Sequence, residues 1–179
     1  VYPLAWDLTV DYDKWIRQSF FGTGNSSRYA DRAYYTREPF EISWLASRGF
    51  TRRIVGQVGW RFKSIRSSNF DERFDNLRPY SDFSYVSYLS FPVAFRYDSR
   101  DHFLTPSRGI VLEAEVEPAP RFSFGGTTFT KISATARSYS VLFYPRTVLA
   151  LRANAQQLFG DVPVPLYLSL GGGSTLRGY

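Results

Sequence analysis

The surroundings of Arg177 suggest a functional site more than those of any other residue, because it is a single cation inside a glycine-rich run. The run reads GGGSTLRGY and consists of Gly171, Gly172, Gly173, Ser174, Thr175, Leu176, Arg177, Gly178 and Tyr179. Glycine has no Cβ atom, so consecutive glycines let a backbone fold close to other segments. The pattern therefore fits a loop that carries the guanidinium group of Arg177 into a confined space. A flexible connector has the same composition, and this alternative stays open.

A second candidate is the row of carboxylates Glu113, Glu115 and Glu117. Alternate residues of a β-strand share a face, so these side chains would lie roughly 6–7 Å apart along one strand. Such a row is compatible with acid–base catalysis or with a divalent metal site. Because no second ligand cluster is visible, we expect the acids to face water and the cations of other strands. We expect no catalytic residue, no metal site and no cofactor.

Composition excludes several classes of protein. The chain of 179 residues has no cysteine and one histidine, so it has no disulfide framework, no thiolate metal site and no site that needs two histidines. Aromatic residues make up 18% of the chain, a content that fits β-structure. No apolar run reaches the length of about 18 residues that a transmembrane helix needs. A transmembrane β-strand needs only about 9–11 residues of alternating character, and that remains possible.

The net charge of +6 admits anionic partners, but the arginines are scattered along the sequence. A nucleic-acid-binding protein would need a clustered basic patch, so we expect no nucleic-acid partner. Single arginines that alternate with apolar residues instead indicate the polar face of a sheet or the wall of a water-filled lumen.

Eight segments alternate between apolar and polar side chains as β-strands do. They are residues 2–12, 26–35, 40–47, 53–63, 83–97, 110–117, 129–143 and 147–159. Residues 36–39 are predicted to separate the second strand from the third, and Pro92 indicates an irregularity inside the fifth. Short turns alternate with longer loops such as residues 66–81. The sequence shows no helix of convincing length.

An antiparallel meander with one apolar and one charged face has two common forms. In a soluble sandwich the apolar face is inside, whereas in a membrane barrel it contacts lipid and the polar face lines the lumen. Charges of both signs on the polar faces, and Tyr, Trp and Phe near strand ends, favour the barrel. The fold class is therefore predicted to be all-β, an antiparallel transmembrane β-barrel. The soluble sheet stays as the alternative.

Three runs resemble the BamA superfamily of outer-membrane proteins, also called bacterial surface antigens. Residues 97–109 are similar to the family signature between two barrel strands, on the residues Asp98, Arg100, Asp101, Pro106, Arg108 and Gly109. Residues 21–25, which contain Gly22 and Gly24, resemble a family turn. The run GGGSTLRGY resembles the tip of the sixth extracellular loop, and the order of the three runs also agrees.

The resemblance implies a barrel of about 16 strands, of which residues 1–179 would form about eight and end at the sixth loop. It implies a location in the outer membrane of a Gram-negative bacterium, or of an organelle descended from one. In the family, the arginine of this loop pairs with acidic residues of later strands inside the barrel, a role that would fall on Arg177, supported by Gly178 and Tyr179. No POTRA-like pattern is visible, and we expect the chain to be a portion of a larger barrel protein.

The implied function is non-enzymatic: insertion and folding of β-barrel clients, or translocation of proteins. Expected partners are outer-membrane lipids, client β-barrel or secreted proteins, and accessory assembly subunits. Three alternatives stay open: the barrel of a two-partner secretion member, the barrel of a member fused to a soluble hydrolase, and a small structural barrel or adhesin. A small closed barrel would end on a strand with a terminal aromatic residue, whereas this chain ends on a loop motif.

Overall fold

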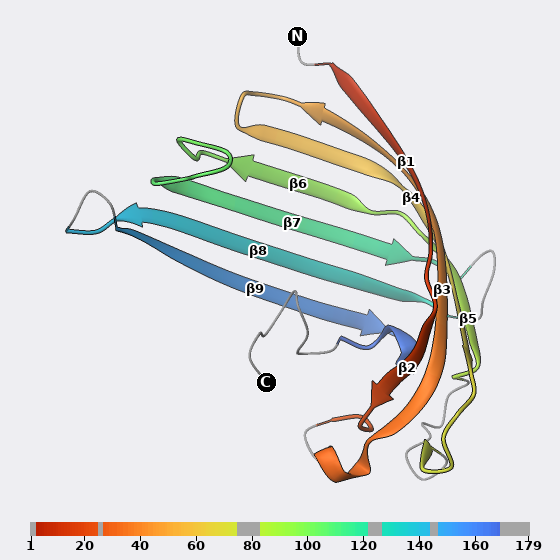
Figure 1. Cartoon of the computed structure of the whole chain (residues 1–179). Coiled ribbons are helices and arrows are strands. Elements are labelled where there is room, and N and C mark those ends of the chain that lie inside the picture. Colours follow the sequence, from red (N-terminus) through yellow and green to blue (C-terminus); the bar gives the residue numbers. More distant parts are fainter. Residues whose placement is uncertain (1–2, 25–26, 75–82, 122–126, 144–146, 169–179) are drawn as a thin grey trace.

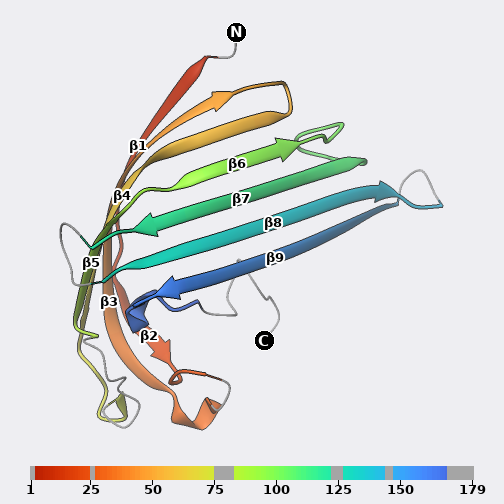
Figure 2. The ribbon, with the colours of Figure 1, turned by 180° about the vertical axis from the view of Figure 1, so that it is seen from behind.

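The protein is a single antiparallel β-sheet in a computed structural model that describes residues 3–24, 27–74, 83–121, 127–143 and 147–168 (Figures 1 and 2). Its described strands are β1 (Leu4–Tyr12), β2 (Trp15–Phe20), β3 (Ala33–Gly49), β4 (Ile54–Ser68), β5 (Tyr85–Ser90), β6 (Val93–Asp98), β7 (Gly109–Ala119), β8 (Phe129–Val141) and β9 (Val148–Gly160). Two 3₁₀ helices accompany them, η1 (Tyr29–Asp31) and η2 (Val164–Leu166). None of the described helices is long and apolar enough to cross a membrane.

The strand order is β1-β3-β4-β6-β7-β8-β9. Strand β2 pairs with β3 beyond the end of β1, and β5 pairs with β4 beyond the end of β6, so β1 and β2 form one row of the sheet and β5 and β6 form another. All described neighbours pair antiparallel, and the described sheet is open, with β1 and β9 at its edges. Both views show that the sheet is strongly curved (Figures 1 and 2). The all-β prediction is confirmed, and the curved open sheet is what part of a barrel would present.

The strand registers place the alternating residues on two faces, as the sequence predicts. On one face, here called the apolar face, Trp44 lies beside Leu8 on β1 and Trp60 on β4. The same face continues through Phe95, Ala114 and Ala134 to Ala155 on β9. Large side chains on it are exposed: Trp6, Val58, Phe95, Leu112, Ile132 and Leu151. The opposite face, here called the polar face, carries most charged residues of β3, β4, β6, β7 and β8, whereas Glu38, Arg48 and Arg66 fall on the apolar face by register.

The predicted break at residues 36–39 is wrong. Residues 33–49 form the single strand β3, which pairs with β4 from Thr36 to Gly49. The predicted strand at 26–35 is also only partly right, because η1 precedes Ala33. Pro39 lies inside β3, and its carbonyl oxygen accepts a hydrogen bond from the Asp13 N–H (3.1 Å). Its missing N–H therefore faces the row of β1 and β2.

That row is interrupted opposite Pro39. Tyr12 ends β1 beside Phe40, and Trp15 begins β2 beside Arg37, so the two intervening residues fall at the proline. Proline cannot donate to a ladder, which weakens pairing at this point. The sequence predicts a break after residue 13 but misses β2. The described residues form nine strands where eight are expected, because β2 is added, two predicted strands merge into β3, and the predicted strand 83–97 divides into β5 and β6.

Pro92 separates β5 from β6, which confirms the irregularity predicted at this residue. The carbonyl oxygen of Pro92 accepts a hydrogen bond from the Gly59 N–H (3.2 Å), so its missing N–H faces β4. Strand β4 pairs with β6 up to Val58 and with β5 from Arg61 onward. Strand β4 also continues to Ser68, three residues into the predicted loop 66–81.

The connections at the two ends of the sheet differ in length. At one end, here called the turn end, residues 50–53, 99–108 and 142–147 join neighbouring strands. At the other end, called the loop end, segments 21–32, 69–84, 120–128 and 161–168 follow the strands. The segment at 21–32 reverses the chain as predicted, and it begins with positive φ angles at Gly22 (87°) and Gly24 (87°). The expected alternation of short turns and longer loops holds for the links at 50–53 and 142–147, whereas the link at 99–108 is as long as some at the loop end.

Replacing Gly59 with Ala is expected to destabilise the sheet where β4 changes partner. A Cβ atom there would collide with the backbone oxygen of Trp44 and lie 2.8 Å from Cδ2 of Leu45. Overpacking of this kind costs about 1–3 kcal/mol. The matched control is Gly56→Ala, whose Cβ would meet only the ring of Phe50, a side chain that can move. Urea titrations of the protein in detergent micelles give both free energies of unfolding; equal values would contradict the prediction.

Candidate functional site

The centre of the polar face holds a partly buried cluster of ion pairs on β3, β4 and β7. Nη1 of Arg61 lies 2.8 Å from Oε2 of Glu117, and Nε of Arg61 lies 3.1 Å from Oε1 of Glu41. Lys63 Nζ donates to the other oxygen of Glu41 (2.9 Å). The hydroxyl of Ser90 donates to Oε1 of Glu117 (2.6 Å). The Glu117 carboxylate, with a side chain only 3% exposed, is therefore held by both a guanidinium and a hydroxyl group.

A second network lies toward the turn end. Glu113 contacts Arg96 on β6 (3.6 Å) and Arg137 on β8 (3.1 Å), and Arg96 also contacts Asp98 (3.0 Å). These side chains are about one-third exposed, in contrast to Glu117. The expectation that the glutamate row faces cations of other strands is confirmed for Glu113 and Glu117.

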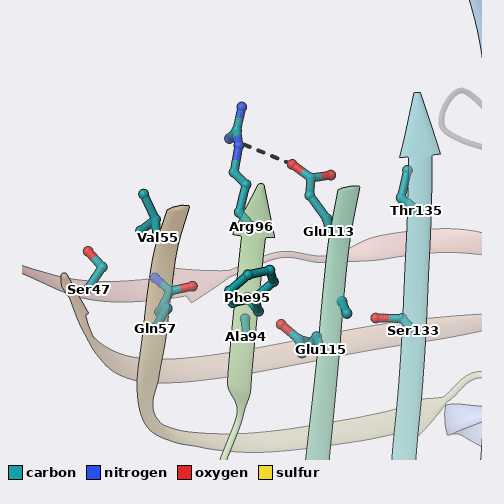
Figure 3. A pocket seen from close by; sticks show the side chains of 11 residues that line it. Ser47, Val55, Gln57, Ala94, Phe95, Arg96, Glu113, Glu115, Ser133 and Thr135 are labelled. Atoms are coloured by element: carbon teal, nitrogen blue, oxygen red, sulfur yellow. Dashed lines mark ion pairs between the residues drawn. The ribbon is translucent and has the colours of Figure 1, made fainter. Parts of the chain in front are cut away.

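Glu115 differs from its two neighbours. It has no ion pair or hydrogen bond from its side chain to any residue that the structure describes. It lines a hollow of about 430 Å³ together with Gln57, Ser47, Ser133 and Thr135. Figure 3 shows this hollow, with the ion pair of Arg96 and Glu113 at its rim. The hollow thus offers a carboxylate without a direct ion pair, next to small polar groups and to the pair of Arg96 and Glu113.

The turn at residues 99–108 is fixed by two carboxylates of the predicted signature. Asp98 binds the Arg100 guanidinium through Nη2 (2.7 Å) and Nε (3.0 Å). The Asp101 carboxylate accepts hydrogen bonds from the Ser107 hydroxyl and from the N–H groups of His102 (2.9 Å), Ser107 (2.9 Å) and Arg108 (3.1 Å).

Gly109 closes this turn with a φ of +112°, and a Cβ there would lie 2.5 Å from the Ser99 carbonyl oxygen. The signature residues Asp98, Arg100, Asp101 and Gly109 therefore act on the turn's own backbone and side chains. Pro106 lies within the same turn.

The loop end of the polar face is apolar, which the sequence analysis does not predict. Phe20, Ala33, Tyr35, Phe74 and Phe83 form one cluster, in which Tyr35 and Phe83 meet edge to face (5.0 Å between centroids). Val86, Tyr88, Ala119 and Phe129 form a second. The polar face is therefore a charged surface that changes to an aromatic one at the loop end.

Residues 161–168 lie against both clusters after β9 ends. Val164 is buried in the first, and Val162 and Leu166 pack against the second. The carbonyl oxygen of Pro165 accepts a hydrogen bond from Nη2 of Arg37 on β3 (3.3 Å). The chain that leads toward the GGGSTLRGY run is thus held on the polar face. The sequence of residues 162–167 is apolar and rich in proline, and this composition could have indicated the docking. The search for alternating strands does not detect it.

The residues of the run itself, Gly171, Gly172, Gly173, Leu176, Arg177, Gly178 and Tyr179, lie outside the described residues. Their role therefore stays a prediction. Within the described residues, no group of three or more His, Cys, Asp or Glu side chains is placed to hold a metal ion.

Replacing Glu117 with Gln should destabilise the protein far more than replacing Glu113 with Gln. Removing one partner of a buried ion pair costs about 3–5 kcal/mol where the other charge is left unpaired. The contact of Arg61 with Glu41 offsets part of this loss. Loss of a partly exposed pair costs about 0–1 kcal/mol. Urea unfolding in micelles measures both variants, and Arg61→Met added to Glu117→Gln should restore most of the stability. A loss of unfolding free energy at Glu113 as large as that at Glu117 would contradict the prediction.

Replacing Asp101 with Ala should reduce the dependence of stability on acidic pH. The hydrogen bonds to Asp101, foremost that of the Ser107 hydroxyl, hold the pKa of its carboxyl group well below the usual range. A carboxyl with a lowered pKa stabilises the fold above its unfolded pKa of about 3.9, and this contribution is lost as pH falls. The melting temperature of the parent should therefore drop more than that of the variant between about pH 6 and pH 3. Asp31→Ala is the control, and an identical drop in parent and Asp101→Ala would contradict the prediction.

Comparison with known protein families finds one match, the Omp85 superfamily domain, over residues 1–179. No curated protein and no solved structure matches the chain significantly. The match covers the whole chain and agrees with the all-β antiparallel sheet and its two faces. This chain therefore belongs to the Omp85 superfamily, whose members are outer-membrane β-barrels with a general role in protein assembly or translocation.

Proposed function

We propose that this chain is part of a barrel that inserts and folds client β-barrel proteins in the outer membrane. The family supports assembly or translocation in general. The observation that carries the finer proposal is the docking of residues 161–168 on the polar face. Residues 161–168 precede the GGGSTLRGY run and lie on the face that would line the lumen, which supports an inward path for that run. The apolar face would contact membrane lipids.

The proposed role of Arg177 is to pair with a carboxylate on the polar face. An extended chain spans at most ~3.3–3.6 Å per residue, so the nine steps from Leu168 to Arg177 reach about 30 Å. Glu115 lies four residues before Ala119 on β7, or about 14 Å along the strand. Since Leu166 packs against the cluster that contains Ala119, Glu115 is within reach of Arg177.

Glu115 is the member of the glutamate row that suits this role. Glu113 and Glu117 already pair with arginines, whereas Glu115 lines the polar hollow without an ion pair to a described residue. A guanidinium group could make two parallel, charge-assisted hydrogen bonds to a carboxylate there. The family resemblance implies a partner on later strands, and this sequence offers Glu115.

Client strands would then pair with an exposed strand edge of the barrel, in the manner of β-strand addition. Backbone hydrogen bonds of this kind do not depend on side-chain identity, so one edge can serve many clients. The contribution of the loop would be to keep the barrel wall in the shape that permits such pairing. The proposed partners of this barrel are client β-barrel proteins and accessory assembly subunits.

Replacing Arg177 with Ala should impair client insertion. In a strain that depends on the variant, folded client barrels in the outer membrane should fall severalfold, measured by their mobility on gels without boiling. Arg121→Ala, an exposed arginine at the loop end, is the control and should leave insertion unchanged. Unchanged insertion with Arg177→Ala would refute the role of the loop. Normal client barrels but reduced secreted proteins would favour translocation over insertion.

A further inference from the structure

Four arginines that are scattered in the sequence meet in one hollow at the turn end. Arg52 and Arg53 come from the turn between β3 and β4, Arg96 from β6, and Arg100 from the turn after β6. The hollow has a volume of about 410 Å³ and is also lined by Val55, Asp98 and Phe103. Asp98 is the one acidic residue among these lining residues, so their formal charge is +3 (four arginines and one aspartate).

The four arginines differ in the number of ion pairs and hydrogen bonds that their guanidinium groups form. Arg100 binds Asp98 through two nitrogens and donates from Nη1 to the carbonyl oxygen of Phe103 (3.1 Å). Arg96 is shared between Asp98 and Glu113. Arg52 and Arg53 are exposed and form no ion pair or side-chain hydrogen bond with any residue in the described part of the chain. Two guanidinium groups are thus left for a ligand.

The turn that carries Arg52 and Arg53 is held in place by its backbone. The hydroxyl of Thr51 accepts hydrogen bonds from the N–H groups of Arg53 (3.2 Å) and Ile54 (3.1 Å). The Arg53 carbonyl oxygen accepts a hydrogen bond from the Asp98 N–H (2.8 Å), which ties this turn to the next one. The backbone that carries the two cations is therefore already ordered, so little backbone ordering would oppose ligand binding.

The position of the hollow and its present contacts indicate the ligand. Arg53, Val55, Arg96 and Asp98 follow the alternation of the polar face, so the hollow opens away from the apolar face and its lipid. Asp98 already shows how a carboxylate is held there, between Arg96 and Arg100. Phe103, 72% exposed beside the hollow, adds an apolar contact of the kind that a polypeptide side chain can use.

We propose that this basic hollow binds an acidic polypeptide segment through carboxylate contacts to Arg52 and Arg53. Planar guanidinium groups match carboxylates in two-point contacts. The site lies at the opposite end of the sheet from residues 161–168, and it does not rest on the role of Arg177. It would let the turn end of the barrel capture acidic stretches of a partner or client protein.

The test measures binding of a short fluorescein-labelled peptide with a run of aspartates to the full-length protein in detergent micelles. Fluorescence anisotropy should show binding that weakens as salt rises from about 50 mM to about 500 mM. The double variant R52Q/R53Q should weaken binding about tenfold, because two charge-assisted contacts are lost. The matched control R28Q/R73Q removes two exposed arginines at the loop end and should bind as the parent does.

Unboiled gel mobility verifies that both double variants are folded. Equal peptide affinity in parent and R52Q/R53Q would overturn the proposal, as would equally tight binding of the same peptide with asparagines in place of aspartates. Phosphatidylglycerol vesicles or a single-stranded oligonucleotide provide phosphate groups instead of carboxylates. Binding of either that depends on Arg52 and Arg53, without binding of the acidic peptide, would also overturn it.

Discussion

The hydrogen-bond ladder between neighbouring strands is the constraint on which the rest of this structure depends. In hydrocarbon, backbone groups have no water to bind, so they must pair within the sheet. Each register fixes two surfaces at once, because side chains alternate between faces. Trp44 beside Trp60 sets the apolar face, and the neighbouring pair of Ser43 and Arg61 sets the polar one. A slip of one residue would exchange Trp60 and Arg61, so lipid contact and the central ion pairs are specified together.

This coupling explains how much of the fold can be predicted from sequence. Alternation correctly separates Ile54, Val58, Trp60 and Phe62 from the cations between them, and it orders the antiparallel meander. It fails at Pro39, where turn-like residues lie inside a strand because the missing N–H faces a gap in the neighbouring row. A local pattern cannot show that gap, since the gap belongs to a partner strand. The short strand β2 is missed for the same reason.

The site is predicted less completely than the fold. The glutamates of β7 were expected to face cations, and Glu113 and Glu117 do so; only the registers show which arginine each one meets. Aromatic residues near strand ends suggest membrane girdles, yet Tyr35, Phe83 and Phe129 pack on the polar face beneath residues 161–168. The basic hollow is invisible in the sequence, because its arginines come from segments that are more than forty residues apart, as with Arg52 and Arg96. The role of Arg177 stays a prediction.

Pro39 and Pro92 also have a consequence for cooperativity. Pro39 directs its missing donor at the row of β1 and β2, which changes strand there, whereas Pro92 lies where its own row changes from β5 to β6. Hydrogen exchange commonly shows that proteins open in contiguous units. The two interruptions lie at different points along β4, since Pro39 is opposite Ile65 and Pro92 accepts a hydrogen bond from Gly59. Local opening of β2, which carries Phe20 beside the first aromatic cluster, would therefore not require opening of β6, which carries Arg96 of the basic hollow.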